Sequence, residues 1–335
     1  TGTNGKTTTK ELVSTVLSKM GNVLYTEGNL NNHIGVPLTL LRITKQHKIA
    51  VVEMGANHPG EIKTLVNIVC PDYGLITNVG RAHLEGFGSF EGVKRTKGEL
   101  YDYLRANGGR GFLFTDSTDL TEMAKGLPVI GYGTADTDTN YVSGQVVKGG
   151  SPYLGADVKC FDETVHIDTK LIGDYNISNL LSAVCVGRFF DVPMSAIKKA
   201  IEEYTPSNNR SQLLKTEHNT LIVDAYNANP TSMTASIKNF ATLDLPNKMC
   251  ILGDMGELGA DSELEHQKIV SLLQSSDFEQ VILVGKKFAT TNNTFINFDN
   301  TEALKAYIHK EPISGKTILI KGSNSMKMYT LPEIL

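Results

Sequence analysis

The stretch that decides the fold opens the chain, where residues 1–10 read TGTNGKTTTK. Gly2 and Gly5 lack a Cβ, so backbone N–H groups beside them can approach phosphate oxygens closely. In such a loop Lys6 reaches the β- and γ-phosphates of a nucleotide, and the hydroxyl of Thr7 binds Mg²⁺. Apolar residues then recur at helical spacing, which predicts a phosphate loop opening a helix. A glycine-rich helix start without a ligand is the alternative.

Length and composition limit the classes of protein that the chain can represent. Its 335 residues predict about two domains, and 40% hydrophobic residues are enough for buried cores. The net charge of −4, without a Lys/Arg block, argues against binding to a nucleic-acid backbone. The sequence contains no run of 18 apolar residues, so no segment is expected to span a membrane. Four widely spaced cysteines without a CxxC pair are interpreted as buried small hydrophobic residues of a cytoplasmic protein.

Short apolar runs in the first 200 residues are interpreted as strands. These runs do not alternate with polar residues, which is typical of strands covered on both faces in a parallel sheet. A Gly/Val/Thr/Tyr-rich stretch partly alternates and predicts a small antiparallel insertion. The expected strands are 49–52, 74–79 and 111–114, the insertion is 137–170, and the expected helices are 176–190 and 194–204.

A polar cluster around Pro206 predicts the boundary between two domains, 1–206 and 207–335. Strand and helix patterns alternate again after it, which is typical of a second α/β unit with a mostly parallel, Rossmann-like sheet. Its expected strands are 220–224, 249–252, 281–284 and 317–320, with helices starting near 232, 262 and 302. The predicted fold class is therefore α/β, a phosphate-loop domain followed by a Rossmann-like domain.

Two polar residues follow expected strands, at the edge where open α/β sheets bind ligands. Glu53 follows the strand 49–52, and a carboxylate there can hold Mg²⁺ beside a triphosphate; a helix-capping or solvent-facing Glu is equally compatible with the sequence. His83 follows the strand 74–79, although an isolated loop histidine is usually a surface residue. Lys97 lies on the next predicted helix, and no physical feature of the sequence separates it from neighbouring lysines.

These residues belong to segments that resemble the ATP-dependent Mur ligases along nearly the whole chain. The long blocks at 76–99 and 224–233 (beginning ITNVGRAHLEGFGS and DAYNANP) are similar to one branch of that family. That branch joins D-alanyl-D-alanine to UDP-N-acetylmuramoyl-tripeptide during synthesis of peptidoglycan precursors. The other matching segments are 1–10, 29–37, 53–61, 173–183, 253–259 and 321–323.

The resemblance implies a reaction and a set of cofactors. ATP phosphorylates the terminal carboxylate of the tripeptide, the amine of D-alanyl-D-alanine attacks the acyl phosphate, and amide, ADP and phosphate result. Two Mg²⁺ ions are implied, the first held by Thr7 and Glu53 and the second by His83 and a carbamylated Lys97. Lys6, His83 and Lys97 are the implied catalytic residues, and a monomer is expected.

The resemblance also implies which residues bind the nucleotide and the substrate. The nucleotide-binding residues are Gly2, Thr3, Asn4, Gly5, Lys6, Thr7, Thr8, Asn176, Asn179, Arg210 and Asp224. The substrate-binding residues are Asn31, Asn32, Tyr226, Asn227 and Asn229. The sequence departs from the family pattern at Tyr175, where His is usual, at Asn324, where Arg often stands, and around Arg210, which Asn209 and Ser211 flank in place of Gly and Leu.

The family has an N-terminal UDP-binding domain and a strand before the phosphate loop, and neither is expected in these 335 residues. We therefore expect little or no ligase activity from these residues alone, because remote binding energy positions the reacting carboxylate. Three alternatives remain: a diaminopimelate-adding or folylpolyglutamate-type amide ligase, a phosphate-loop ATPase of another class, and a non-catalytic fragment. A switch or motor ATPase is disfavoured, because Asp224, the acidic strand end that could serve it, lies in the second domain.

Overall fold

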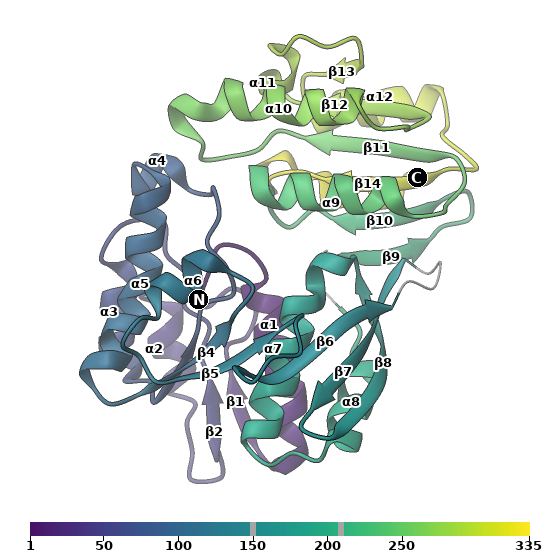
Figure 1. The fold of residues 1–335 in the computed structure, drawn as a ribbon. Coiled ribbons are helices and arrows are strands. Elements are labelled where there is room, and N and C mark those ends of the chain that lie inside the picture. Colours follow the sequence, from purple (N-terminus) through teal and green to yellow (C-terminus); the bar gives the residue numbers. More distant parts are fainter. Residues whose placement is uncertain (148–151, 207–210) are drawn as a thin grey trace.

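The computed structural model describes residues 1–147, 152–206 and 211–335 and divides them between two α/β units (Figure 1). The first unit, purple to teal in the figure, contains the phosphate loop, and the second, green to yellow, contains the C-terminus. The predicted fold class is confirmed. The predicted boundary at 206 borders residues outside the described ranges and stays a prediction.

The first unit is built on a sheet in the order β3-β4-β5-β6-β7-β8, with a separate parallel pair β1-β2. Its strands are β1 (Val23–Tyr25), β2 (Ile49–Val51), β3 (Tyr73–Leu75), β4 (Arg110–Phe114), β5 (Val129–Gly133), β6 (Asn140–Val147), β7 (Tyr153–Cys160) and β8 (Glu163–Ile172). Its helices are α1 (Lys6–Leu17), α2 (Gly35–Leu40), α3 (Glu61–Val69), α4 (Leu84–Phe87), α5 (Phe90–Ala106), α6 (Thr118–Met123), α7 (Ile177–Phe189) and α8 (Met194–Glu203).

The antiparallel insertion is present, but it continues the main sheet. Strand β6 pairs in parallel with β5, and β7 and β8 then add in antiparallel fashion. Helices α1, α7 and α8 cover one face of the sheet and bury apolar side chains such as Leu12, Leu181 and Ile197. Helices α3 and α5 cover the other face through Leu65 and Leu100. Burial on both faces explains why β4 and β5 lack alternation.

The second unit has one sheet in the order β13-β12-β11-β14-β10-β9, parallel except for β9. Two helix layers cover it, one core containing Met233 and Ile269 and the other Leu304 and Ile308. The strands are β9 (Gln212–Lys215), β10 (Thr220–Asp224), β11 (Lys248–Gly253), β12 (Gln280–Val284), β13 (Ile296–Phe298) and β14 (Thr317–Lys321). The helices are α9 (Pro230–Thr242), α10 (Ser262–Gln274), α11 (Lys286–Ala289) and α12 (Thr301–Lys310).

Three expectations differ from the structure. The run 49–52 was expected in a sheet covered on both faces, but as β2 it lies in a two-stranded sheet with β1 and is partly exposed. The strand expected at 74–79 is shorter in the structure, where β3 ends at Leu75, and the residues after it bond to the phosphate loop: Thr77 N donates to Thr1 O, and Asn78 O accepts from Thr3 N. Cys70 was expected to be buried, and it is exposed at the end of α3; the other three cysteines are buried and free. No helix among the described residues is long and apolar enough to cross a membrane.

Candidate active site

A cavity of about 830 Å³ lies between the two units. The first unit contributes the phosphate loop and the segments that follow β1, β2, β3 and β8. The second contributes the carboxyl ends of β10 and β14 and the first turns of α9. The predicted residues that line it are Thr3, Asn4, Gly5, Lys6, Thr7, Thr8, Asn31, Asn32, Glu53, His83, Asn176, Asn179, Asp224, Tyr226, Asn227 and Asn229.

The two predicted glycines shape the phosphate loop by close approach. Gly5 has a φ of 77°, and a Cβ there would lie 2.6 Å from Asn179 Oδ1. A Cβ on Gly2 would lie 2.0 Å from Thr77 Oγ1, so this position has no room for a side chain. Gly2 packs against Thr77 and does not line the cavity. Lys6 Nζ donates to the Thr3 carbonyl at 2.9 Å, which holds its ammonium within the loop. An anion in this loop would therefore meet backbone N–H groups and a positive charge.

Glu53 and Thr7, which the resemblance implies as ligands of one magnesium ion, hydrogen-bond to each other. Thr7 Oγ1 donates to Glu53 Oε1 at 3.2 Å, and Asn31 Nδ2 donates to the same oxygen at 2.8 Å. The other oxygen, Glu53 Oε2, is buried and has no hydrogen-bond partner within the described ranges. A buried carboxylate oxygen without a partner is costly unless a cation or another ligand satisfies it. A hydroxyl beside a free carboxylate oxygen fits the oxygen ligands that Mg²⁺ prefers.

His83 and Lys97 both lie close to the ring of Phe87. The ring centroid of His83 is 6.3 Å from that of Phe87, and Lys97 Nζ lies 5.1 Å from the same centroid. His83 Nδ1 contacts the carboxylate of Glu257 of the second unit, and this contact holds the pKa of Glu257 below its usual range. No cluster of three or more His, Cys, Asp or Glu side chains suited to a metal occurs in the part of the chain that the structure describes. A second ion here would thus depend on a modified Lys97.

Lys97 is buried behind the cavity wall and does not line it. Its Nζ donates to the carbonyl of Ala56, a residue that does line the cavity, at 3.1 Å. Burial, and secondly the charge of Lys6, lower the pKa of Lys97 to about 7. A lysine with this pKa has a large neutral fraction near pH 7, and the neutral amine is the form that reacts with carbon dioxide.

Asn176 and Asn179 form one buried amide pair at the start of α7. Asn179 Nδ2 donates to Asn176 Oδ1 at 2.8 Å, and Thr9 donates to Asn179 Oδ1 at 3.1 Å. Tyr175, which stands where the family usually has His, lines the cavity beside them and bonds to Ser211 Oγ at 3.1 Å. This wall therefore combines amide groups with an aromatic ring.

Asp224 ends strand β10 and contacts the buried Lys321 at the end of the neighbouring strand β14. Lys321 Nζ donates to Asp224 Oδ2 at 2.5 Å, and Ser236 donates to the same oxygen at 3.2 Å. Sequence reasoning assigned no role to Lys321, although its place in the segment 321–323, at a strand end, could have indicated one. The predicted contact Arg210 lies outside the described residues.

The predicted substrate residues differ in the local hydrogen bonds that they form. Asn32 Oδ1 accepts from the backbone N–H of Ile34 and Gly35, so it caps the turn before α2. Asn227 Oδ1 accepts from the N–H of the next residue, Ala228. Asn324, at a position where the resembled family often has Arg, donates to the carbonyl of Tyr226 at 3.2 Å. These contacts hold the loops beside the cavity in place. Asn31 differs from them because its side chain donates to the Glu53 carboxylate.

Comparisons with known proteins match both units of the chain to domains of one enzyme family. Residues 1–187 match the family described as Mur ligase middle domain, and residues 209–324 match Mur ligase, glutamate ligase domain. A relative from Escherichia coli (strain K12), named UDP-N-acetylmuramoyl-tripeptide–D-alanyl-D-alanine ligase, is 34% identical, with 98% of this chain and 74% of the relative covered. A crystal structure of MurF from Acinetobacter baumannii is similar with a TM-score of 0.87 at 28% identity, over 99% of this chain and 74% of that one. MurF ligase from Thermotoga maritima, solved in complex with ADP, gives 0.86 at 25% identity, over 99% and 77%.

Proposed function

Because this chain belongs to the Mur ligase family, we propose that it joins D-alanyl-D-alanine to UDP-N-acetylmuramoyl-tripeptide in an ATP-dependent reaction of peptidoglycan precursor synthesis. One observation supports this function most: a single cavity holds the phosphate loop, the Glu53 carboxylate and the polar loops of both units. A ligase that activates a carboxylate with ATP needs the triphosphate and both substrates in one enclosed place.

We assign the nucleotide to the side of the cavity formed by the phosphate loop, Asn176, Asn179 and Asp224. The backbone N–H groups of residues 2–8 and the Lys6 ammonium bind the phosphates. The amide pair of Asn176 and Asn179 presents hydrogen-bonding groups for the adenine. Asp224 is assigned to the ribose, and Arg210 to a phosphate.

Two magnesium ions fit this scheme. Thr7 and Glu53 hold the first, and the unpaired Glu53 oxygen supports that assignment. His83 and a carbamylated Lys97 hold the second, since carbamylation converts a cation into a carboxylate-like ligand. Bound magnesium supplies positive charge that stabilises the transferring phosphoryl group and the two anions brought together.

The residues of the chain then have separate tasks during the reaction. Lys6 stabilises the negative charge that develops on the γ-phosphoryl group while the tripeptide carboxylate attacks it. The loops of Asn31, Tyr226 and Asn229 orient the carboxylate and the incoming amine beside that group. The amine replaces phosphate at the acyl carbon, so each turnover yields one amide, one ADP and one phosphate.

We further propose that the domains divide at residue 206 and that the protein acts as a cytoplasmic monomer. The polar cluster at 205–209 supports the boundary, and the separate sheets on either side of it agree with that position. The UDP-linked substrate and ATP are both water-soluble, which suits a reaction in the cytoplasm.

Phosphate release by the full-length protein tests the proposed function. We expect release from ATP only when both UDP-N-acetylmuramoyl-tripeptide and D-alanyl-D-alanine are present. Equal release with either substrate omitted would indicate an ATPase of another class. Release with diaminopimelate or glutamate in place of the dipeptide would indicate another amide ligase of the family.

A further inference from the structure

His83 and Glu257 face each other across the boundary between the two units, and both have unusual backbones. His83 has a φ of 52° and Glu257 a φ of 58°, in the left-handed region that non-glycine residues rarely adopt. Strained backbone of this kind persists where the surrounding structure requires a particular side-chain direction, and it concentrates at functional sites. Here two such residues are joined by one contact, between His83 Nδ1 and the Glu257 carboxylate.

The contact uses only one nitrogen of the histidine ring. Nδ1 faces the Glu257 carboxylate, and Nε2 has no partner among the residues that the structure describes. A carboxylate on Nδ1 favours the tautomer with the hydrogen on Nδ1, which leaves the lone pair of Nε2 free. His83 lines the cavity, so this lone pair is available to a ligand there.

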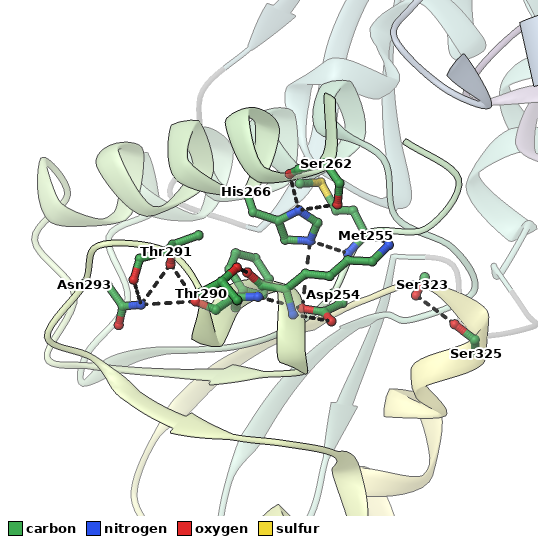
Figure 2. Close-up of polar contacts among 11 residues, drawn as sticks. Asp254, Met255, Ser262, His266, Thr290, Thr291, Asn293, Ser323 and Ser325 are labelled. Carbon is green, nitrogen blue, oxygen red and sulfur yellow. Dashed lines mark hydrogen bonds and ion pairs between the residues drawn. The ribbon is translucent and has the colours of Figure 1, made fainter. Parts of the chain in front are cut away.

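The loop that carries Glu257 is anchored in the second unit. Asp254 accepts from the backbone N–H groups of Lys287 and Phe288, which lie in the first turn of α11. His266 extends from α10 toward this loop, and its Nε2 accepts from the N–H of Met255 at 3.0 Å (Figure 2). These hydrogen bonds hold the backbone at Asp254 and Met255 in place. Glu257 follows Met255 by two residues, so the position of its loop is fixed as well.

Further contacts join the two units near this pair. Glu85 N donates to the carbonyl of Glu257 at 3.4 Å, and Arg81 lies 3.7 Å from the carboxylate of Glu265. The Glu257 side chain is itself 56% exposed, and ion pairs at such positions contribute little to stability. Orientation of His83 is thus a better explanation of the pair than cohesion of the two units.

We propose that Glu257 is a positioning residue that holds His83 by Nδ1 and directs Nε2 into the cavity. The second metal site is then complete only when the C-terminal unit is docked against the first. Metal-binding histidines commonly donate their other ring N–H to a carboxylate, which fixes the ring and raises its basicity. This inference rests on the proposed function, which assigns His83 to the second magnesium ion.

Two measurements test this inference by comparing the unmutated protein with the variant Glu257→Ala. Nitrogen NMR of the metal-free protein is expected to show hydrogen on Nδ1 of His83 in the unmutated protein, and a shift toward the Nε2–H tautomer in the variant. Titration with Mn²⁺ in the presence of ADP and bicarbonate, followed by electron paramagnetic resonance, is expected to show a second ion bound about 10- to 100-fold more weakly in the variant. The first ion and ADP should bind with unchanged affinity.

Two control variants complete the design. Glu257→Gln keeps an oxygen that accepts the same hydrogen bond, and it is expected to restore the tautomer and most of the Mn²⁺ affinity. Glu263→Ala removes the same charge from an exposed position nearby and should change neither readout. An unchanged His83 tautomer or an unchanged second-ion affinity in Glu257→Ala overturns the inference, as does a loss in Glu257→Gln equal to that in Glu257→Ala. A single bound ion in the unmutated protein overturns the proposed second site and this inference together.

Discussion

The side chains of Asn4 and Asn229 hydrogen-bond to each other, although 225 positions separate them in the chain. Asn229 Nδ2 donates to Asn4 Oδ1 at 2.8 Å, and Asn4 Nδ2 lies 3.5 Å from Asn229 Oδ1. Asn4 belongs to the phosphate loop, and Asn229 is the N-cap of α9 in the second unit. The phosphate loop therefore contacts the C-terminal unit directly, and the proposed nucleotide site lies beside a hydrogen bond between the two units.

Replacing Asn229 with Ser should weaken ATP binding without unfolding α9. Serine is also a good N-cap, but its shorter side chain does not reach Asn4. The lost hydrogen bond predicts an affinity about 2- to 10-fold lower by isothermal titration calorimetry. Asn300→Ser is the matched control, because Asn300 caps α12 in the same unit through its bond to Ala303. Equal ATP affinities in the two variants would show that the bond between the units has no role in binding.

Replacing Lys6 with Ala should abolish turnover and leave the fold intact. The ammonium points into the phosphate loop and stabilises charge that develops on the transferring group, so we expect a decrease of at least about 100-fold in phosphate release. Lys19→Ala, on the exposed turn after α1, is the control. Circular dichroism should be the same for both variants. Retained turnover in Lys6→Ala would remove the phosphate loop from the mechanism.

Lys97 should form a carbamate. The pH dependence of carbamate formation should follow the lowered pKa of Lys97, about 7. Above that value the amine is neutral and reacts with carbon dioxide, whereas below it the ammonium does not. Carbon-13 NMR with labelled bicarbonate is therefore expected to show a carbamate signal that rises through about pH 7, not near the usual 10.4 of lysine. Lys97→Ala should lack the signal, and short carboxylic acids should partly restore its activity. A variant that no acid rescues would leave the carbamate without support.

Much of this fold follows from local pattern. The strands β10, β11, β12 and β14 are continuous apolar runs, and they lie within about one residue of their expected bounds. Strand β9 was missed because it is a short, polar-flanked edge strand, and β13 because its three residues show no pattern. The hydrogen bond that joins Thr77, after β3, to Thr1 of the phosphate loop links distant parts of the chain, so no local pattern contains it.

The C-terminal unit should lose stability in mild acid through His266. This side chain is fully buried; Nδ1 lies 2.6 Å from the carbonyl of Ser262, and Nε2 accepts from Met255 N. Burial lowers its pKa, so the unfolded chain binds a proton that the folded chain does not. Stability is therefore present above the ordinary histidine pKa of about 6.5 and decreases as the pH falls below it.

Urea unfolding at about pH 7.5 and about pH 5.5 measures this effect. His266→Gln does not titrate in this range, and its amide oxygen can still accept from Met255. We expect the variant to be less stable than the unmutated protein at the higher pH and to show a smaller decrease between the two values. A decrease of equal size in both proteins would assign the acid sensitivity to other groups.

The candidate site was accessible to sequence reasoning only in part. The phosphate loop could be predicted from spacing, because its chemistry requires glycines, Lys6 and Thr7 next to one another. The contacts between the units could not, because Asn229 and Glu257 meet their partners through docking of two separate sheets. Lys97 carried no local signal, and its burial and lowered pKa arise from α5 packing against the segment of Ala56.

The central claim is that ATP activates the tripeptide carboxylate as an acyl phosphate within this cavity. The most direct test uses full-length protein and UDP-N-acetylmuramoyl-tripeptide labelled with oxygen-18 in its terminal carboxylate, with mass spectrometry of the released phosphate. We predict that one labelled oxygen passes from the carboxylate to phosphate for each amide formed. Unlabelled phosphate, released while D-alanyl-D-alanine is joined or without any joining, would contradict the account.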